Sequence, residues 1–193
     1  SSVMGASKRL GEMVMASMAS VSQTKFMAVR FGNVLGSSGS AVNIFKEQIA
    51  NGGPVTVTHP DITRYFMTTQ EAVQLILQAC AMGAGGEIFV LNMGEPVRVL
   101  DLVKNLILLT GLEPEKDIAV RFTGLRPGEK MYEELFRAED IRKDTGHPDI
   151  FMAIPEGLGA TLAKEQAMEL RALCELSGTE PLLARLKELI PAS

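Results

Sequence analysis

Short apolar segments alternate with longer amphipathic segments along this chain, and the alternation limits the folds that are open to it. Five short apolar runs between turn residues predict strands: residues 25–31, 55–58, 63–67, 87–92 and 118–122. Four stretches with apolar residues at helical spacing predict helices: residues 2–20, 41–51, 68–82 and 100–110. Strands that alternate with helices are typical of an α/β domain that contains at least part of a parallel sheet.

The C-terminal part of the chain continues this pattern less regularly. Residues 131–136 are expected to form a helix or a turn, and residues 150–154 an extended segment. The tail predicts two helices with apolar stripes, formed first by Ala163, Ala167, Leu170 and Cys174 and then by Leu182, Leu183, Leu186 and Ile190. Nothing in this tail suggests a chemical role, so we interpret it as a packing or oligomer surface.

The composition excludes several classes of function. With 193 residues, 46% of them hydrophobic, the chain is long enough to bury a core. Its net charge of −4 argues against broad nucleic-acid binding, so an anionic ligand would have to be met by local arginines. Cys80 and Cys174 are too few for a disulfide framework, and His59 and His147 lack the spacing of a metal site. No apolar run reaches the roughly 18 residues that span a bilayer.

Residues 32–40, Gly-Asn-Val-Leu-Gly-Ser-Ser-Gly-Ser, form a loop of mostly small residues between a predicted strand and a predicted helix. Such loops let backbone N–H groups approach a ligand closely, although the same composition also makes an ordinary strand-to-helix turn. The sequence has no G-x-G-x-x-G or G-x-x-G-x-x-G fingerprint, which cradles the pyrophosphate in dinucleotide-binding proteins. We therefore expect that cradle to be absent from this chain.

Four motifs carry a resemblance to a known family. They are Met4-Gly-Ala-Ser-Lys8-Arg9, Arg30-Phe-Gly-Asn33-Val-Leu-Gly-Ser, Thr63-Arg64-Tyr-Phe-Met and Gly124-Leu-Arg126-Pro-Gly-Glu129-Lys-Met-Tyr-Glu-Glu. In this order they resemble the C-terminal half of the CapD-type polysaccharide biosynthesis proteins, over about residues 1–155. These are NAD-dependent UDP-N-acetylglucosamine 4,6-dehydratases of the extended short-chain dehydrogenase/reductase superfamily. The resemblance implies a partial Rossmann sheet plus a smaller α/β substrate-binding domain, with the N-terminal nucleotide-binding half missing.

Met4 and Lys8 lie one turn apart on the same face of the first predicted helix. Taken alone, they are an apolar filler residue and a solvated surface lysine. The resemblance implies instead that Lys8 binds the nicotinamide ribose of NAD and holds it for hydride transfer. Met4 stands where the superfamily usually has a tyrosine, and it cannot exchange a proton. The acid/base groups are therefore expected on a Thr-Asp-Lys stretch shortly before Ser1, so we expect the chain to be truncated and to bind no NAD by itself.

The resemblance also implies four substrate-binding residues. Asn33 is expected to hydrogen-bond the sugar nucleotide near its diphosphate, although the residue type also suits an ordinary turn. Arg64 and Arg126 are expected to grip the diphosphate, because a planar guanidinium meets phosphate oxygens with two bonds at once. The alternative is a pair of ordinary salt-bridged arginines. Glu129 is expected either to orient Arg126 or to contact the uridine ribose, and the sequence leaves both open.

These implications predict a division into three parts. Residues 1–50 would be a remnant of the NAD-binding Rossmann domain, residues 51–155 the nucleotide-sugar-binding domain, and residues 156–193 C-terminal helices. The predicted function is the substrate-binding part of a lyase that converts UDP-N-acetylglucosamine to a UDP-4-keto-6-deoxy sugar for capsule or other surface polysaccharides, inactive as this fragment. The alternatives are a nucleotide-sugar epimerase of the same superfamily and a non-catalytic UDP-binding or assembly module.

The same resemblance implies partners and a location. A UDP-sugar is the expected ligand, and nucleic acid and metal are not expected. Removal of a cofactor-binding half would expose apolar surface around Met4 and residues 25–31, so a homo-oligomer is expected. The expected location is cytoplasmic, with the parent protein anchored to the cytoplasmic face of the inner membrane through an N-terminal region outside this chain.

Overall fold

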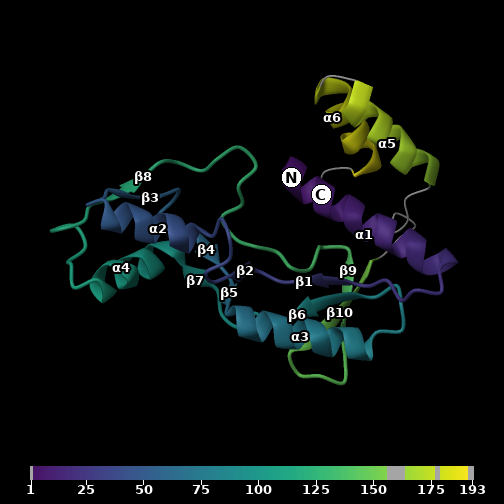
Figure 1. Cartoon of the computed structure of the whole chain (residues 1–193), viewed down its shortest axis with the longest axis horizontal. Coiled ribbons are helices and arrows are strands. Elements are labelled where there is room, and N and C mark those ends of the chain that lie inside the picture. The colour runs from purple at the N-terminus through teal and green to yellow at the C-terminus, as the bar shows by residue number, and fades with distance from the viewer. Residues whose placement is uncertain (1, 156–163, 177–178, 191–193) are drawn as a thin grey trace. The chain divides into compact units, whose positions relative to one another are not determined.

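The computed structural model describes residues 2–155, 164–176 and 179–190, and the chain divides into two compact units (Figure 1). Unit 1 comprises residues 1–30, 79–90 and 136–193, and unit 2 comprises residues 31–78 and 91–135. Each unit is therefore assembled from segments that are distant in sequence. The division predicted at residues 50 and 155 concerns function, whereas these two units are defined by packing. The functional division therefore stays a prediction.

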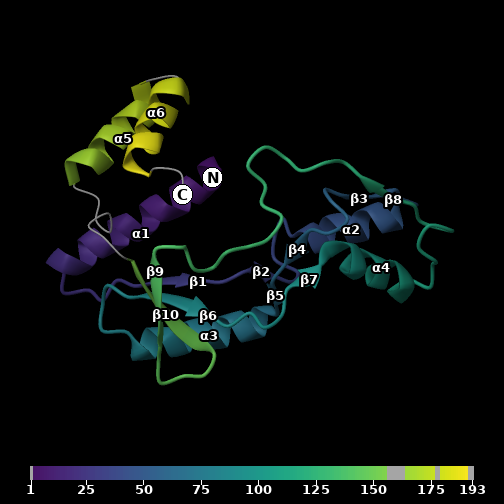
Figure 2. The same cartoon turned by 180° about the vertical axis from the view of Figure 1, so that it is seen from behind.

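Unit 1 contains a four-stranded sheet in the order β1–β6–β10–β9. Its strands are β1 (Ala28–Arg30), β6 (Ile88–Leu91), β9 (Asp140–Asp144) and β10 (Ile150–Pro155). β1 and β6 run parallel, with Val29 opposite Phe89, whereas β9 and β10 form an antiparallel pair (Figure 2). All four residues of β6 are buried, as expected for a strand that is covered on both faces. The predicted α/β class with part of a parallel sheet is confirmed.

Three helices of unit 1 share a small apolar cluster: α1 (Val3–Val21), α5 (Lys164–Leu176) and α6 (Thr179–Leu189). Met13 of α1 is buried there together with Leu170 of α5 and Leu186 of α6. Figure 1 shows the two tail helices beside α1. The prediction of two tail helices is confirmed, and Ala163 of the first predicted stripe lies outside the described residues.

A cluster of charged side chains connects α1 to the sheet of unit 1. Glu12 forms ion pairs with Arg9, Arg30 and Arg137, and Arg30 also pairs with Asp140. Burial disfavours the charged form of Glu12, but hydrogen bonds and charges from Arg30, with those of Arg137 and Arg9, outweigh burial and lower the pKa of Glu12. The side chain of Asp140 is fully buried, and its Oδ1 has no hydrogen-bond partner among the described residues. The cluster thus holds ionised groups in a largely buried position.

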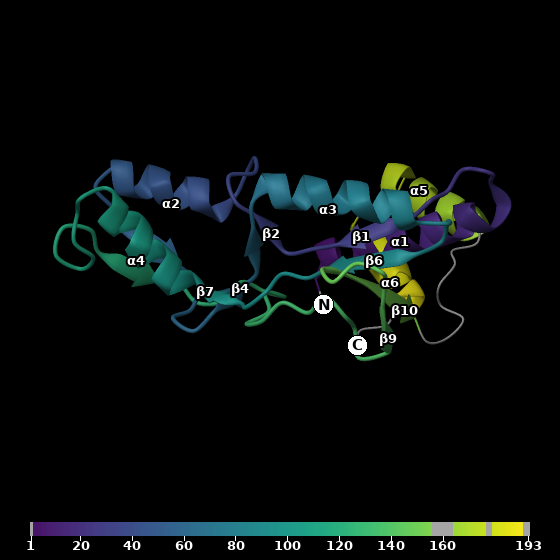
Figure 3. The same ribbon diagram turned by 90° about the horizontal axis from the view of Figure 1, so that it is seen from below.

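Unit 2 is built on two parallel strands and two helices: α2 (Ala41–Ala50), β3 (Val55–Val57), α4 (Val99–Leu109) and β8 (Val120–Phe122). In β3 the buried Val55 and Val57 alternate with Thr56, and Val55 lies opposite Val120. Side chains spaced four apart on the helices complete the core, namely Phe45, Ile49, Val99, Val103 and Ile107. Figure 3 shows α2 and α4 near each other in unit 2, and they are in contact. The predicted elements in this region are confirmed with small shifts at their ends.

The predicted single strand over residues 63–67 is wrong, because the chain bends at Tyr65. Two-residue strands form on each side of the bend and pair with different partners: β4 (Thr63–Arg64) with β7 (Val97–Arg98), and β5 (Phe66–Met67) with β2 (Asn33–Val34). The Tyr65 carbonyl accepts a hydrogen bond from the Asn33 N–H at 2.9 Å. The bend therefore brings the loop of residues 32–40 against the segment that carries Arg64.

The remaining elements agree with the sequence prediction to different degrees. Helix α3 (Thr69–Met82) is present as predicted, and Thr68, which precedes it, exchanges hydrogen bonds with Glu71. Residues 131–136, expected to form a helix or a turn, form bends. Strand β9 was not predicted, because its residues are mostly charged and exposed and show no apolar alternation. None of the described helices is long and apolar enough to cross a membrane.

Candidate functional site

One cavity in unit 2 brings together the four residues predicted to bind substrate. It has a volume of about 390 Å³, and Asn33, Arg64, Arg126 and Glu129 all line it. The remaining wall is formed by the loop of residues 37–41, by residues 56–58 at the end of β3, and by apolar side chains that include Phe45, Ile62, Phe66 and Val99. Polar groups from three distant segments thus converge on a cavity that is partly apolar, as in many ligand sites.

The start of α2 forms one wall of this cavity. Ser40 caps the helix, because its Oγ accepts a hydrogen bond from the Val42 N–H at 3.3 Å. The Asn43 side chain donates to the Ser37 carbonyl at 3.1 Å and so holds the preceding loop against the first turn. A helix N-terminus carries a partial positive charge and N–H groups without intrahelical partners. The loop of residues 37–41 therefore presents a surface that suits an anionic group.

Asn33 lies at the start of β2, where its side chain is exposed and lines the cavity. Its Nδ2 donates to the Tyr65 carbonyl at 3.2 Å and to Glu133 Oε1 at 3.1 Å. The preceding residue has to be small, because a Cβ on Gly32 would lie 2.7 Å from the Tyr65 Cβ. Glycine therefore permits the close approach that sets the position of Asn33.

Arg64 lines the same cavity, but its guanidinium is largely engaged within the protein. Nη1 donates to the carbonyls of Thr63 at 2.7 Å and Met131 at 3.2 Å. Nη2 lies 3.5 Å from Glu129 Oε1, and Nε lies 3.7 Å from Glu133 Oε1. These contacts connect β4 to residues 129–133. Only 17% of the Arg64 side chain is exposed, and it also lines the cavity.

Arg126 differs from Arg64 in its freedom. It lies in an exposed turn, and its guanidinium has no hydrogen-bond or ion-pair partner in the part of the chain that the structure describes. Glu129 closes this turn by accepting a hydrogen bond from the Arg126 N–H at 3.0 Å, and it accepts another from the Thr58 hydroxyl at 3.1 Å. Glu129 thus holds the backbone of Arg126, and its two expected roles, toward Arg126 and toward the uridine ribose, stay predictions. Among the described residues, Arg126 is therefore the cavity-lining cation without a partner.

Glu133 was not predicted as a site residue, although it belongs to the last of the four motifs. Its carboxylate meets the Asn33 amide, the Tyr65 N–H and the Arg64 guanidinium. The neighbouring Glu134 instead pairs with Lys130 and is exposed. Without a helix over residues 131–136, spacing alone could not show which glutamate faces inward. Only the fold of the segment distinguishes them.

Met4 and Lys8 belong to unit 1, on the first turns of α1. Both side chains are exposed, with Met4 at 65%, and Ser2 caps the helix by accepting from the Gly5 N–H at 3.1 Å. Lys8 has no ion-pair partner among residues 2–155, 164–176 and 179–190. The predicted pair therefore forms an accessible helix face that carries one free cation. Among the same residues, no group of three or more histidine, cysteine, aspartate or glutamate side chains is placed to hold a metal ion.

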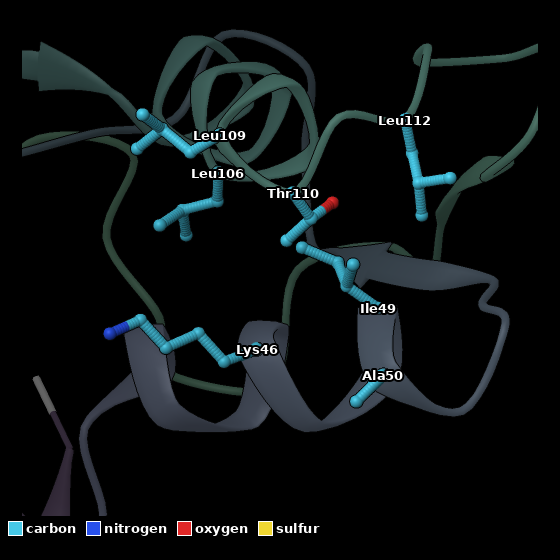
Figure 4. A pocket seen from close by; sticks show the side chains of 7 residues that line it. All are labelled: Lys46, Ile49, Ala50, Leu106, Leu109, Thr110 and Leu112. Carbon is cyan, nitrogen blue, oxygen red and sulfur yellow. The ribbon is translucent and has the colours of Figure 1, made fainter.

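A second cavity in unit 2, of about 490 Å³, lies between the C-terminal ends of α2 and α4. Its lining is Lys46, Ile49, Ala50, Leu106, Leu109, Thr110 and Leu112. Figure 4 shows the Lys46 amino group directed away from the Thr110 hydroxyl, so the two polar groups do not converge. None of the predicted site residues lines this cavity. It offers an apolar surface without an evident chemical role.

Comparison with known proteins places most of this chain in one group of sequences. The sequence profile described as polysaccharide biosynthesis protein matches residues 1–155. The chain is 57% identical over 148 residues to the probable polysaccharide biosynthesis protein EpsC of Bacillus subtilis, and 57% identical over 152 residues to the capsular polysaccharide biosynthesis protein CapD of Staphylococcus aureus. These matches cover 77% and 78% of this chain but 25% of each relative. A UDP-glucose 4-epimerase of Rickettsia canadensis is 35% identical over 84% of this chain and 47% of its own length.

Solved structures agree with this grouping. The X-ray structure of Pen from Bacillus thuringiensis matches 83% of this chain and 50% of that chain, with 37% identity and a TM-score of 0.68. DesIV, a dTDP-glucose 4,6-dehydratase of Streptomyces venezuelae solved with NAD, matches 63% of this chain and 38% of its own, with 17% identity and a TM-score of 0.55, a likeness of fold alone. The fold is that of part of an extended short-chain dehydrogenase/reductase, as predicted. The chain spans about a quarter of EpsC and CapD and half of Pen.

Proposed function

The chain belongs to the polysaccharide biosynthesis protein family, and we propose that it forms the nucleotide-sugar-binding part of a sugar-nucleotide 4,6-dehydratase. The substrate would be UDP-N-acetylglucosamine, and the product a UDP-4-keto-6-deoxy sugar for a surface polysaccharide. One observation carries this proposal, namely the cavity of unit 2 that gathers Asn33, Arg64, Arg126 and Glu129. The cavity joins a free arginine, a helix N-terminus and apolar walls, which together suit a diphosphate attached to a less polar nucleoside or sugar.

In this proposal Arg126 binds the diphosphate directly. Its guanidinium is exposed and unpaired within the described residues, so a phosphate can bind it without displacing a carboxylate. The start of α2 supplies N–H groups on the same cavity wall. Arg64 contributes positive charge from a fixed position, because backbone carbonyls and two glutamates already hold it. Each charge-assisted hydrogen bond contributes about 1.5–3 kcal/mol, so a few are enough to select a diphosphate.

In the proposed reaction the C4 hydroxyl of the sugar is oxidised to a ketone, the C5 proton is removed, water leaves from C6 and a hydride returns to C6. NAD supplies this oxidation and reduction when it is bound, and it is regenerated in each turnover. One side chain of this chain fits a cofactor-binding role, namely Lys8, which is exposed and unpaired within the described residues and suits the nicotinamide ribose. Met4 itself can neither donate nor accept a proton. The remaining contacts to NAD and the acid/base groups would come from the part of the relatives that this chain does not span.

A related epimerase is the second candidate, because a UDP-glucose 4-epimerase matches 84% of this chain. Both activities need the same diphosphate contacts, and they differ in the steps after oxidation at C4. Methionine at position 4 favours the dehydratase, since an acid/base residue on this helix would be the usual requirement of the epimerase. A third candidate is a module that binds UDP without catalysis, which the cavity alone would permit.

Calorimetry with the 193-residue chain tests the binding part of the proposal. We expect saturable binding of UDP and UDP-N-acetylglucosamine and no heat of binding with NAD. The absence of UDP binding would refute the assigned cavity, and tight NAD binding would refute the assignment of the cofactor contacts to the part of the relatives that this chain does not span. Product analysis with a protein that spans the full length of these relatives then separates the enzymes. A 4-keto-6-deoxy product supports the dehydratase, whereas a C4 epimer formed without loss of water supports the epimerase.

A further inference from the structure

The amide of Asn33 has a fixed polarity in this structure. Its Nδ2 lies 3.2 Å from the Tyr65 carbonyl oxygen and 3.1 Å from Glu133 Oε1. A backbone carbonyl and an ionised carboxylate can only accept hydrogen bonds, so the amide nitrogen and not the oxygen must face them. Both N–H groups of the side chain are therefore used. The remaining polar atom of the Asn33 side chain is Oδ1, a hydrogen-bond acceptor.

Glu133 is held firmly enough to impose this polarity. Its Oε2 accepts from the Tyr65 N–H at 3.3 Å, and its Oε1 lies 3.7 Å from the Arg64 Nε. Arg64 is itself held by the carbonyls of Thr63 and Met131. Two of its neighbours, the Tyr65 N–H and the Arg64 guanidinium, can only donate, so Glu133 offers acceptor oxygens to Asn33, and a rotated Asn33 amide would set its own oxygen against them.

Phosphate oxygens near neutral pH act almost entirely as acceptors, and an amide with no N–H left cannot bind them. We propose that Glu133 is a positioning residue that turns Asn33 Oδ1 toward the ligand, so that Asn33 accepts a hydrogen bond from a hydroxyl or amide N–H of the nucleotide sugar. This rests on the proposed function, since it concerns the ligand of the same cavity. It changes the role expected for Asn33, because the diphosphate is left to Arg126 and the start of α2. A UDP-sugar offers such donors on its sugar and on its uridine.

A double-mutant cycle tests this polarity. We expect Glu133→Leu and Asn33→Ala each to weaken UDP-N-acetylglucosamine binding by about tenfold or more, because the first removes the support of the Asn33 acceptor and the second removes the acceptor itself. The double variant Asn33→Ala/Glu133→Leu should bind within about threefold of Asn33→Ala, because Glu133 acts through Asn33. Fully additive losses in the double variant would overturn the proposal. Glu134→Gln is the matched control, since Glu134 pairs with the exposed Lys130 and does not line the cavity, and it should leave binding unchanged.

Two further readouts separate this inference from the proposed function. In the free protein, the Asn33 side-chain NH₂ signals in ¹⁵N NMR should shift in Glu133→Leu and stay in place in Glu134→Gln; unmoved signals in Glu133→Leu would overturn the positioning role even if no ligand bound. Absence of binding by the wild type would instead refute the proposed function. Parallel titrations identify the donor. A Glu133→Leu defect for UDP-N-acetylglucosamine alone assigns the donor to the sugar, and an equal defect for UDP assigns it to the uridine.

Titration with inorganic pyrophosphate completes the design, because pyrophosphate retains the diphosphate and lacks every donor of the sugar and the uridine. Glu133→Leu should leave its affinity within about twofold of the wild type, whereas Arg126→Ala should abolish the binding. If Glu133→Leu weakened pyrophosphate as strongly as it weakened UDP-N-acetylglucosamine, Asn33 would be a diphosphate contact and the inference would be wrong.

Discussion

Glu12 of α1 and Arg30 of β1 form an ion pair with an Oε1–Nε distance of 2.6 Å, and their side chains are only 12% and 13% exposed. Removing one partner of such a pair leaves a charge in a poorly solvated place, which costs more than the pair itself contributes. We therefore expect Glu12→Ala to lower the free energy of unfolding by about 3 kcal/mol. Urea denaturation followed by circular dichroism measures this change.

Glu47→Ala provides the control for this substitution, since Glu47 is an exposed helical glutamate with no ion pair among the described residues. Its effect should stay within about 0.5 kcal/mol. Equal effects of the two substitutions would show that the charge cluster contributes nothing to stability.

The same cluster predicts how stability depends on pH. Burial raises the pKa of Asp140, but the Arg137 N–H and the Arg30 guanidinium outweigh burial, so the pKa of Asp140, like that of Glu12, lies below its ordinary value. A carboxylate with a lowered pKa in the folded state stabilises the fold above its unfolded pKa of about 4, and this contribution is lost as the pH falls through the folded pKa.

We therefore expect the contribution of this cluster to the free energy of unfolding to be constant above about pH 5 and to fall below about pH 4. Glu12→Gln should be less stable than the wild type at pH 7 and should lose less stability on acidification. Denaturation curves at pH 7, 5 and 3 test this, and identical losses in both proteins would contradict it.

The helices of this protein were predictable because their apolar residues recur at the spacing of the buried face. Val99, Val103 and Ile107 of α4 are an example, since all three enter the core of unit 2. Strands of two residues were not predictable in the same way. β5 exists because its backbone pairs with β2, more than thirty residues earlier, and no local pattern records that pairing.

The candidate site shows the same limit. Motif resemblance brought Asn33, Arg64, Arg126 and Glu129 into consideration, and the structure places them on one cavity. The sequence could not show that backbone carbonyls engage Arg64 while Arg126 has no partner among the described residues, because the residue type is the same at both positions. Glu133 was missed because its importance lies in contacts with Asn33 and Tyr65, which the fold creates.

The difference between the two arginines leads to a binding prediction. Arg126→Ala removes the free guanidinium from the cavity and should weaken UDP binding roughly ten- to hundredfold, the loss expected for one or two charge-assisted hydrogen bonds. Because Arg126 is exposed, the free energy of unfolding should change by less than about 0.5 kcal/mol. Calorimetry measures the affinity and urea denaturation the stability.

Arg121→Ala is the matched control for Arg126→Ala. Arg121 is an exposed arginine of the adjacent β8 that does not line the cavity, and its loss should leave UDP affinity unchanged. If both substitutions weakened binding equally, the attraction would be a general effect of charge and not a contact made by Arg126.

The last prediction concerns Gly32, whose lack of a side chain allows β2 to approach the Tyr65 bend. A Cβ at this position would lie 2.7 Å from the Tyr65 Cβ, 3.1 Å from the Tyr65 carbonyl oxygen and 3.2 Å from the Met93 Cε. Met93 can move, but the other two atoms belong to or adjoin the backbone of the bend. Gly32→Ala should therefore destabilise the protein by about 1–3 kcal/mol, a usual cost of overpacking. It should also weaken UDP-N-acetylglucosamine binding, because the Asn33 hydrogen bond to Tyr65 lies next to the clash.

Gly11 supplies the opposite case in the same chain. It lies exposed in α1, and an added Cβ would meet no atom within 4 Å. Alanine is the better helix former, so Gly11→Ala should raise the free energy of unfolding by up to about 1 kcal/mol and leave ligand binding unchanged. Urea denaturation and calorimetry on both variants make the comparison. If Gly32→Ala were as stable as Gly11→Ala and bound the ligand normally, the approach of β2 to Tyr65 would not be what positions Asn33.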